Sequence, residues 1–568
     1  MREGHRWHLP GPEADPDRVA RLARELGCPA RFAQLLLARG FHSPQEALTF
    51  LRPKLAGLSD PFRLPAMEAA VATLFAAVDG GKRIVLYGDY DVDGVTSLAM
   101  LHRMLTAYGA GRVQCFLPLR MDEGYGLTRD GLRRCIKTCQ PELLVALDCG
   151  TRSVEETAEL TARGVEVLVI DHHECPPVLP ACAAVVNPKR PDARYPEDAD
   201  LCTAGLVFKL CHALLKRRPL PGFDLKEMLD LAALGTVADI VPLRGENRIL
   251  VQRGLRQLAQ TRWPGVRALA EAARVNPPYT TGEVGFQLAP RLNAAGRLGT
   301  AEEALRLLLT DDPGEARTLA LELDRRNRER QQVEQETLEA AEAALGDPAE
   351  RFAIVLGQPG WHPGVLGIVA ARLSRRHHRP TWIIGFDEEG IGKGSGRSIE
   401  GAPLVSLLEP CGHLLERFGG HAMAAGLTIR RESFESFQAL FETEVRARLD
   451  AEALRPLIRP ECEIALGELD FGFLDHHESL QPFGAGNPQP LFIARGVVPA
   501  APPVTMKEKH LRLTLRQRDS RHEAVFFNTL AHELPRPPWD VAFRIAPNLW
   551  QGRLRLQIVV QAIRTGPG

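Results

Sequence analysis

The sequence predicts an α/β protein: a parallel-sheet domain, a long helix, a second and smaller α/β domain, and a C-terminal β-barrel of the OB type. Three observations support this prediction. Short apolar runs alternate with helical patterns from about residue 65 to 260, which is typical of a parallel sheet. A long polar stretch at 314–345 precedes a second strand–helix alternation, which continues to about residue 450. From about residue 458 the pattern changes to short alternating strands with proline and glycine turns.

Composition is ordinary for a globular protein and leaves room for large cores. The chain has 568 residues, of which 45% are apolar and 25% charged, and this length suggests about three or four domains. With a net charge of −1, a nucleic-acid-binding surface must be a local basic patch. The eleven scattered cysteines, without a Cys-x-x-Cys pair, argue against a zinc ribbon and fit a reducing compartment. Because no signal peptide or run of about 20 apolar residues is evident, a cytoplasmic protein without membrane contact is expected.

The first half of the chain is expected to hold a helical lead-in and the first sheet. In residues 1–64, helices are expected over Asp17–Leu26 and Pro29–Leu37, with Pro29 at a first helical position. In residues 65–260, a helix is expected over Val95–Ala107. Short apolar runs predict fully buried strands at Ile84–Leu86, Leu143–Leu147 and Val165–Ile170. Further strands are expected at Val113–Leu117 and Ala183–Asn187.

The second half is expected to hold the connecting helix and two further domains. Residues 261–345 read as helical, and the thin apolar stripe of 314–345 suits a helix between domains. Residues 346–450 alternate again, with a strand near Phe352–Leu356, a helix over Val365–Leu373 and a strand over Thr381–Phe386. In residues 458–568, strands are expected at Leu511–Leu515, Ala524–Phe527, Val541–Ile545 and Leu554–Val560.

Four polar clusters follow apolar runs and would meet at one edge of the first sheet. They are Tyr87-Gly88-Asp89-Tyr90-Asp91-Val92-Asp93-Gly94, Asp148-Cys149-Gly150, Asp171-His172-His173 and Asp239. Ligands of open α/β sheets bind outside the carboxyl ends of strands, and carboxylates with imidazoles there suit Mn²⁺ or Mg²⁺. The alternative for the first cluster is an Asp-rich turn that caps the next helix. The four together favour a two-metal site.

A two-metal site suits the hydrolysis of phosphodiesters. The ions lower the pKa of a water molecule and stabilise charge on the phosphoryl oxygens. A carboxylate shared by both ions, for which Asp148 is the candidate, would hold them about 3.5–4 Å apart.

Two glycine-rich segments of the third unit resemble phosphate-binding loops. Residues 392–398 offer backbone N–H groups, the hydroxyls of Ser395 and Ser398, and the guanidinium of Arg397. Residues 419–426, which include His421, would let the backbone approach a ligand closely before a helix. The alternative for both segments is a tight glycine turn.

Basic residues elsewhere are candidate contacts with a nucleic-acid backbone. Arg291 and Arg297 flank small residues in 289–297, where the alternative is a structural turn with salt bridges. On an OB barrel, a C-terminal basic stretch would follow a single strand, whereas on an isolated strand pair it would be a solvated face. That stretch contains Lys507, Lys509, Arg512 and Arg516.

These motifs resemble a known family. Residues 87–94 and Asp171-His172-His173 resemble the DHH phosphoesterase superfamily, and residues 419–426 resemble its partner domain, DHHA1. With residues 289–298, 360–367 and 481–488 added, nearly the whole chain resembles the bacterial RecJ family. The resemblance implies a DHH domain at 65–260, a DHHA1 domain at 346–450 joined to it by the long helix, and an OB domain at 458–568. It also implies a 5′-to-3′ exonuclease specific for single-stranded DNA, which releases 5′-mononucleotides with two Mn²⁺ or Mg²⁺ ions.

The resemblance assigns roles to single residues. The implied metal ligands are Asp91, Asp93, Asp148, His172 and Asp239. Asp89 belongs to the same motif as a ligand or a neighbouring catalytic group, and Tyr87 leaves its role open, because the pyrophosphatase branch of the superfamily has a histidine there. His173 would contact the scissile phosphate and His421 would line the catalytic face. The implied holders of the DNA 5′ end are Arg120, Ser395 and Arg397.

The resemblance further implies a monomer in DNA recombination and repair, with the single-stranded DNA-binding protein and a RecQ-type helicase as partners. One rival is a DHH phosphodiesterase acting on short oligonucleotides or cyclic dinucleotides. Such an enzyme would need only the DHH and DHHA1 domains, so the C-terminal domain favours a long strand. A second rival, an inactive scaffold, would have lost acidic positions that are all present here.

Overall fold

The computed structural model describes residues 4–11, 14–119, 123–124, 126–550 and 552–566. It divides the chain into two compact units, one of residues 53–331 and 482–488, the other of residues 1–52, 332–481 and 489–568. In the described ranges, no single helix is long and apolar enough to cross a membrane. One bent pair, Leu55–Arg63 with Met67–Asp79, meets that test by length and composition alone.

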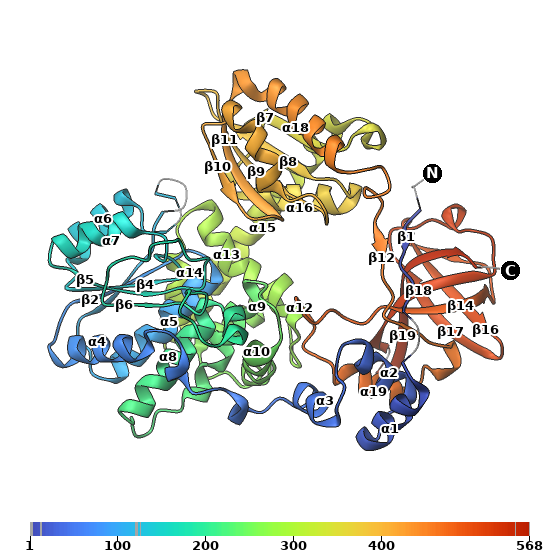
Figure 1. Ribbon diagram of the computed structural model, residues 1–568, viewed down its shortest axis with the longest axis horizontal. Coiled ribbons are helices and arrows are strands. Elements are labelled where there is room, and N and C mark those ends of the chain that lie inside the picture. Colours follow the sequence, from blue (N-terminus) through green and yellow to red (C-terminus); the bar gives the residue numbers. More distant parts are fainter. Residues whose placement is uncertain (1–3, 12–13, 120–122, 125, 551, 567–568) are drawn as a thin grey trace. The chain divides into compact units, whose positions relative to one another are not determined.

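A five-stranded parallel sheet forms the centre of the unit that contains residues 53–331 (Figure 1). Its order is β3-β2-β4-β5-β6, and its strands are β3 (Val113–Phe116), β2 (Ile84–Gly88), β4 (Leu143–Leu147), β5 (Glu166–Ile170) and β6 (Ala184–Val186). Every residue of β2 and β4 is buried. Continuous burial explains why these strands read as uninterrupted apolar runs rather than as alternating patterns.

Helices cover both faces of this sheet, as Figure 1 shows. Ile84 and Leu86 pack in one core with helices α4 (Met67–Asp79), α5 (Val92–Ala107) and α8 (Thr203–Arg217). Val85 and Tyr87 point the other way, into a core with α6 (Arg129–Cys139) and α7 (Val154–Ala162). The predicted parallel α/β domain is therefore confirmed, strand by strand.

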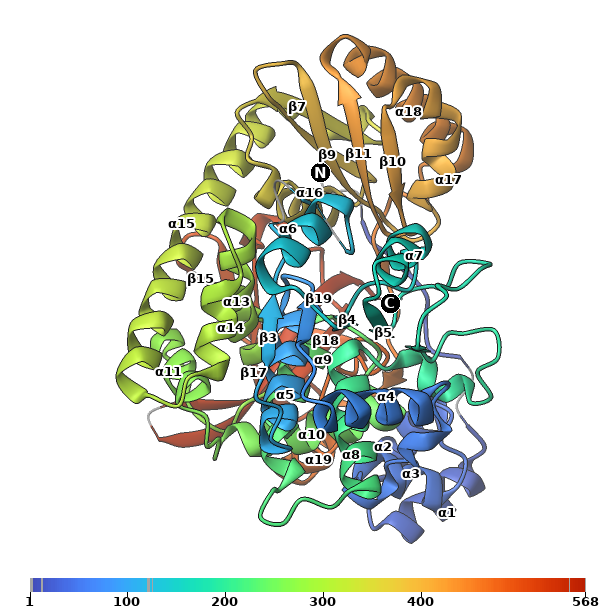
Figure 2. The same ribbon diagram turned by 90° about the vertical axis from the view of Figure 1, so that its left-hand side faces the viewer.

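Further helices of this unit follow the sheet and extend its larger core. They are α9 (Leu229–Ala238), α10 (Gly245–Leu258), α11 (Pro264–Ala273), α12 (Thr281–Glu283), the π-helix η5 (Val284–Leu288), α13 (Ala289–Leu298) and α14 (Glu302–Leu309). The long helix α15 (Pro313–Leu345) comes next (Figure 2). The boundary between the two units falls within it, after Gln331. The predicted long polar helix is thus present.

A mixed five-stranded sheet forms the second α/β domain. Its order is β10-β11-β9-β8-β7, and only β7 and β8 are parallel. The strands are β7 (Ile354–Pro359), β8 (Thr381–Phe386), β9 (Ile391–Arg397), β10 (Arg417–Gly420) and β11 (Ala424–Arg430). One face packs on α16 (Pro363–His377) and the end of α15, the other on α17 (Leu404–Leu408) and α18 (Phe434–Arg448) (Figure 2).

Neither glycine-rich segment of this domain is a loop before a helix, which corrects the sequence prediction: residues 392–397 lie in strand β9, and residues 419–426 form two strand ends with a tight turn between them. Gly392, Gly394 and Gly396 alternate along β9 and face large side chains of its neighbours. A Cβ on Gly396 would lie 2.7 Å from the ring of Trp382. Residues 419–426 form the hairpin of β10 and β11, and no helix follows them directly. The three glycines of β9 therefore leave space for large side chains of the neighbouring strands.

The C-terminal domain is the predicted OB-type arrangement. Pairings run β14-β18-β19-β17-β16, and β14 returns to β16 through two residue pairs only, Val498 with Arg516 and Pro499 with Leu515. The barrel closure is therefore limited. The strands are β14 (Phe492–Pro499), β16 (His510–Gln517), β17 (Ser520–Phe526), β18 (Trp539–Trp550) and β19 (Arg553–Thr565), with shorter β13 (Cys462–Glu463) and β15 (Val504–Met506) at the edges.

The N-terminal helices belong to the same unit as this domain. They are α1 (Pro16–Leu26), α2 (Ala30–Ala38) and α3 (Pro44–Leu51). Pro29 is the residue before α2 rather than its first residue. Arg39 forms an ion pair with Glu461 at 2.7 Å, and Arg31 forms one with Glu468 at 3.1 Å. The predicted helical lead-in thus contacts the start of the OB-type domain.

Candidate active site

Three of the four predicted clusters lie at the carboxyl ends of adjacent strands. Asp89 follows β2, Asp148 follows β4, and His172 follows β5 by two residues. The fourth, Asp239, follows helix α9 and reaches the same place, since its Oδ2 lies 3.5 Å from Nε2 of His172. Parallel strands place their carboxyl ends at one edge, so residues far apart in sequence converge.

The side chains form three overlapping groups of potential ligand atoms, each within 4.8 Å. The groups are Asp89, Asp91 and Asp148, then Asp148, His172 and His173, and finally Asp93, His172 and Asp239. Asp148 belongs to the first two groups and His172 to the last two. This overlap is the arrangement expected where one carboxylate serves two neighbouring cations.

Backbone hydrogen bonds hold the carboxylates in place. Asp91 accepts hydrogen bonds from the N–H groups of Asp93 and Gly94 at the start of α5. Asp93 accepts them from the N–H groups of Thr203 and Ala204 at the start of α8, at 2.9 and 2.7 Å. The helix-capping alternative is therefore correct for Asp91, and capping fixes these carboxylates inside the cluster.

Close packing explains the small residue in the first motif. A Cβ on Gly94 would lie 2.4 Å from the carbonyl oxygen of Asp89, so no larger residue fits this turn.

Asp148 has a φ of 63°, in the left-handed region that few non-glycine residues adopt. Its Oδ1 accepts a hydrogen bond from the Thr203 hydroxyl at 2.9 Å. The chain thus places the Asp148 carboxylate in a fixed, strained position beside the other acids.

Electrostatics in the cluster favour bound cations. Burial, together with the charge of Asp93, raises the pKa of Asp91, Asp148 and Asp239. Carboxylates held this close in a dry environment repel one another, and a cation between them offsets both costs. Burial lowers the pKa of His172, so its imidazole is neutral and able to ligate a metal ion.

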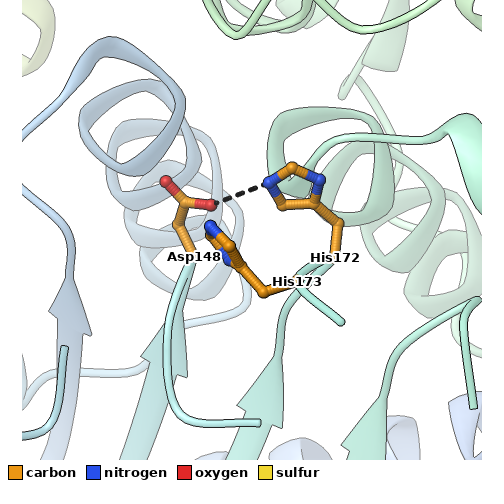
Figure 3. A group of neighbouring side chains, drawn as sticks. All are labelled: Asp148, His172 and His173. Atoms are coloured by element: carbon orange, nitrogen blue, oxygen red, sulfur yellow. Dashed lines mark ion pairs between the residues drawn. The ribbon is translucent and has the colours of Figure 1, made fainter. Parts of the chain in front are cut away.

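The two histidines have different environments. The His172 ring is turned toward Asp148, with Nε2 at 3.4 Å from Oδ1, as Figure 3 shows. His173 donates from Nδ1 to Asp171 at 2.7 Å. Burial lowers the pKa of His173, but the hydrogen bond and charge of Asp171 outweigh burial and raise it overall. His173 therefore carries positive charge more readily than His172.

Sequence patterns identify Asp171 as part of a cluster but do not predict its supporting role, and they do not single out Asn187 or Thr203. Asp171 accepts hydrogen bonds from the N–H groups of Thr151, His172 and His173, so it orients the histidines. The buried Asn187 donates to the Thr151 hydroxyl and to the His173 carbonyl. A polar residue directly after strand β6 was the available signal for Asn187. Thr203 gave no signal, because only the fold brings it to Asp148.

The donor set fits Mn²⁺ or Mg²⁺. It consists of carboxylate oxygens and imidazole nitrogen, which suit these ions. Nε2 of His172 and Oδ2 of Asp239 are buried, and neither atom has a hydrogen-bond partner among the described residues. Buried polar atoms normally have partners, so the pair points to a ligand between them.

Known proteins share this domain arrangement. Family models match at residues 83–236 (DHH family, N-terminal domain), 350–447 (DHHA1 domain) and 461–562 (RecJ OB domain). The chain is 38% identical over 572 residues to the single-stranded-DNA-specific exonuclease RecJ of Thermus thermophilus, covering 99% of this chain and 79% of that protein.

This chain belongs to the RecJ family. It is also 36% identical over 563 residues to the Bacillus subtilis RecJ, covering 98% of this chain and 70% of that protein. The solved structure of Thermus thermophilus RecJ in complex with Mn²⁺ matches with a TM-score of 0.85 at 34% identity, over 100% of this chain and 81% of that one. The complex with Mg²⁺ matches with a TM-score of 0.79 at 33% identity, over 99% and 79%. RecJ structures thus hold the two ions that the present donor set suits.

Two of the three predicted 5′-end residues, Ser395 and Arg397, lie on one face of strand β9 of the RecJ-type DHHA1 domain. Ser395 and Arg397 alternate with the inward glycines, and Arg397 donates to the Ser395 hydroxyl at 3.1 Å. A Cβ on Gly367 of α16 would lie 2.9 Å from both side chains, so this glycine makes room for them. Burial lowers the pKa of the Arg397 guanidinium. A partly desolvated guanidinium beside a hydroxyl suits an anion.

The remaining predicted residues have separate positions. Ser398 donates to the Ala402 carbonyl, and exposed His421 lies in the β10–β11 turn. Arg291 lies in helix α13 and pairs with Asp324 at 2.9 Å, so the salt-bridge alternative describes its contact. Arg120 lies outside the described residues.

The basic residues of the OB-type domain lie on an exposed face of its sheet. Leu511, Leu513 and Leu515 of β16 are buried, and Arg512 and Arg516, which alternate with them along the strand, are exposed. The exposed Lys507 and Lys509 lie in the turn before this strand.

Proposed function

We propose that this chain is a single-stranded-DNA-specific exonuclease that works 5′ to 3′ and releases 5′-mononucleotides. The main support is that the cluster of acidic residues and histidines around Asp148 lies in a chain that matches RecJ exonucleases over 98–99% of its length. The setting is DNA recombination and repair.

The cluster residues divide the work in this proposal. Two Mn²⁺ or Mg²⁺ ions, when bound, would lower the pKa of a water molecule and stabilise charge on the phosphoryl oxygens. The residues that would hold them are Asp91, Asp93, Asp148, His172 and Asp239, with Asp89 as a further carboxylate beside Asp91 and Asp148. Asp171 keeps His173 oriented and favours its charged form, so His173 would donate a hydrogen bond to the scissile phosphate.

Recognition of the DNA would be spread over other residues. Ser395 and Arg397 would bind the 5′ end, with Ser398 and Arg120 as further contacts and His421 at the catalytic face. A guanidinium in fixed geometry binds phosphate through paired hydrogen bonds. Arg291 would contact the backbone only if its ion pair with Asp324 opens.

The length of the substrate separates this function from its rival. A DHH phosphodiesterase acting on short oligonucleotides or cyclic dinucleotides would have no use for the outward row of Arg512 and Arg516. Together with Lys507 and Lys509, these residues would neutralise the backbone of a long strand. The match of residues 461–562 to the RecJ OB domain supports the longer substrate.

We further propose a cytoplasmic monomer whose partners are the single-stranded DNA-binding protein and a RecQ-type helicase. The eleven cysteines are scattered along the sequence without a Cys-x-x-Cys pair, which supports a reducing compartment.

A time course on 5′- and 3′-labelled single- and double-stranded DNA, with Mn²⁺, Mg²⁺ or EDTA, tests the proposal. The expected result is mononucleotides from the 5′ end of single strands, with either metal and not with EDTA. Preferred cleavage of dinucleotides or cyclic dinucleotides would support the rival.

A further inference from the structure

Ile240 and Phe286 expose more of their surface than any other large apolar side chain among the described residues. Phe286 is 84% exposed and Ile240 is 75% exposed. A single exposed apolar residue is ordinary in proteins and needs no explanation. These two, however, are carried by neighbouring segments of one unit, next to Asp239.

Ile240 is held in a conformation that its side chain disfavours. Its φ is 60°, in the left-handed region, where a β-branched residue is a rare outlier. It directly follows Asp239, a member of the metal cluster. Strained backbone of this kind persists only where the surroundings enforce it, and it gathers at functional sites.

Phe286 projects from a single turn of π-helix, η5. Val284 and Leu288 at the two ends of this turn are buried, so the turn is anchored while Phe286 points outward. A Cβ on Gly285 would lie 3.8 Å from Cγ1 of Val237, so η5 rests on the end of α9 that leads to Asp239. Single π turns in helices occur often at functional sites.

A segment distant in sequence forms hydrogen bonds near both Ile240 and Phe286. Residues 482–488, here called the strap, belong to the same unit as the metal cluster. The N–H of Leu243 donates to the Ala485 carbonyl at 2.7 Å, three residues after Ile240. The Thr281 hydroxyl donates to the Phe483 carbonyl at 2.6 Å, five residues before Phe286. The strap therefore forms hydrogen bonds with the two segments that contain Ile240 and Phe286.

The helix that follows η5 packs against the acidic loop of residues 89–93. Helix α13 follows η5, and Oδ1 of its Asn293 accepts a hydrogen bond from the N–H of Val92 at 3.2 Å. A Cβ on Gly296 would lie 3.0 Å from the carbonyl oxygen of Tyr90. Phe286, Ile240 and the carboxylates of 89–93 are thus parts of one packed framework.

We propose that Ile240 and Phe286 contact nucleobases of the bound DNA strand and hold it beside the metal cluster; this inference rests on the proposed function. Every base offers an apolar face, so an aromatic ring and an aliphatic side chain bind bases without reading their sequence. Bases stacked in a duplex do not offer that face. The pair would therefore favour unpaired DNA, while charged residues handle its phosphates.

Substitution of Phe286 tests the contact. Phe286→Ala should raise KM for a single-stranded oligonucleotide about five- to a hundredfold, with a smaller change in kcat, because base–aromatic stacking contributes on this scale. Phe286→Leu should have a smaller effect. Ile240→Gly, which also removes the backbone strain, should weaken binding in the same direction. Leu321→Ala, at an exposed apolar residue of helix α15, is the matched control and should leave KM unchanged.

An oligonucleotide with abasic residues near its 5′ end separates base contacts from structural effects. Wild type should bind it more weakly than the intact strand, and Phe286→Ala should weaken it little further. Equal weakening of intact and abasic strands by Phe286→Ala would overturn the proposal and point to a general distortion or a protein-binding surface. So would an unchanged KM on the intact strand.

Failure of the proposed function gives a different result. A wild-type protein that binds Mn²⁺ but does not hydrolyse single-stranded DNA would contradict both the function and this inference. Active wild type with insensitive Phe286→Ala and Ile240→Gly variants would contradict the inference alone. Thermal unfolding of each variant, measured in parallel, identifies any that does not fold; the other substitution then decides.

Discussion

At the scale of single residues, the surroundings of the Arg397 guanidinium suit the binding of an anion. Its guanidinium is partly buried, donates to Ser395 and packs against a helix where only glycine fits. In the proposed function, Arg397 would select the end of the DNA strand, and the acidic cluster would carry out the chemistry.

Arg397→Ala should reduce the preference for a 5′-phosphate over a 5′-hydroxyl end by about 10- to 100-fold, because a charge-assisted contact contributes about 1.5–3 kcal/mol. The measurement is kcat/KM on the two kinds of end. Lys393→Ala, at an exposed position on the same face of β9, is the control. A full 5′-phosphate preference in Arg397→Ala would remove this residue from the end-binding site.

A second residue-scale prediction concerns Asp230, a buried carboxyl whose pKa burial raises to about 6. The folded state holds this proton more tightly than the unfolded state, where the pKa is near 4. As pH rises from about 4 to about 6, the unfolded state loses its proton first, so the free energy of unfolding falls by about 2–3 kcal/mol.

Asp230→Asn removes this titration, so its stability relative to wild type should increase by about 2–3 kcal/mol between pH 4 and pH 7. Urea unfolding of both proteins at the two pH values measures the difference. The same difference at both pH values would show that the carboxyl does not titrate as described.

At the scale of secondary structure, sequence patterns predicted what local composition determines. Continuous apolar runs identified the strands of the parallel sheet, and Leu143–Leu147 matches β4 end to end. The same logic placed Asp148 and His172 at strand ends. The function of Asp171 as the partner of His173 escaped prediction, because it depends on side-chain geometry.

The glycine-rich strand β9 shows why other elements were missed. Glycine is unfavourable in strands on its own, so residues 392–398 read as a loop. Glycine is required in β9 because side chains of neighbouring strands occupy the space that a Cβ would need. These side chains are Phe386, Leu427 and Trp382. No local pattern contains that information.

Gly396→Ala tests this explanation. Its Cβ would lie 2.7 Å from the Trp382 ring, so it should lower the free energy of unfolding by about 1–3 kcal/mol, the usual cost of overpacking. Gly419→Ala, whose Cβ meets nothing within 4 Å, is the control. Equal unfolding midpoints for both variants would contradict the packing account.

At the scale of the whole molecule, the proposed function requires the OB-type domain to guide a long strand. A variant in which alanine replaces Lys507, Lys509, Arg512 and Arg516 should bind long single strands more weakly, and its binding should depend less on salt concentration. The slope of log K against log salt should fall by about 0.7 for each DNA phosphate that the variant no longer neutralises. Binding measured at several salt concentrations, with an unchanged slope as the contradicting result, decides whether this face tracks DNA.

We propose that Asp148 joins two cation sites of a nuclease. Replacing Asp148 tests this role in a DNA hydrolysis assay, run beside a Mn²⁺ titration of the same protein. Wild type should bind two Mn²⁺ ions and degrade single-stranded DNA. Folded Asp148→Ala should lose the second ion and nearly all hydrolysis, because both ions depend on that carboxylate. A folded Asp148→Ala variant that keeps a tenth of wild-type activity would contradict the account.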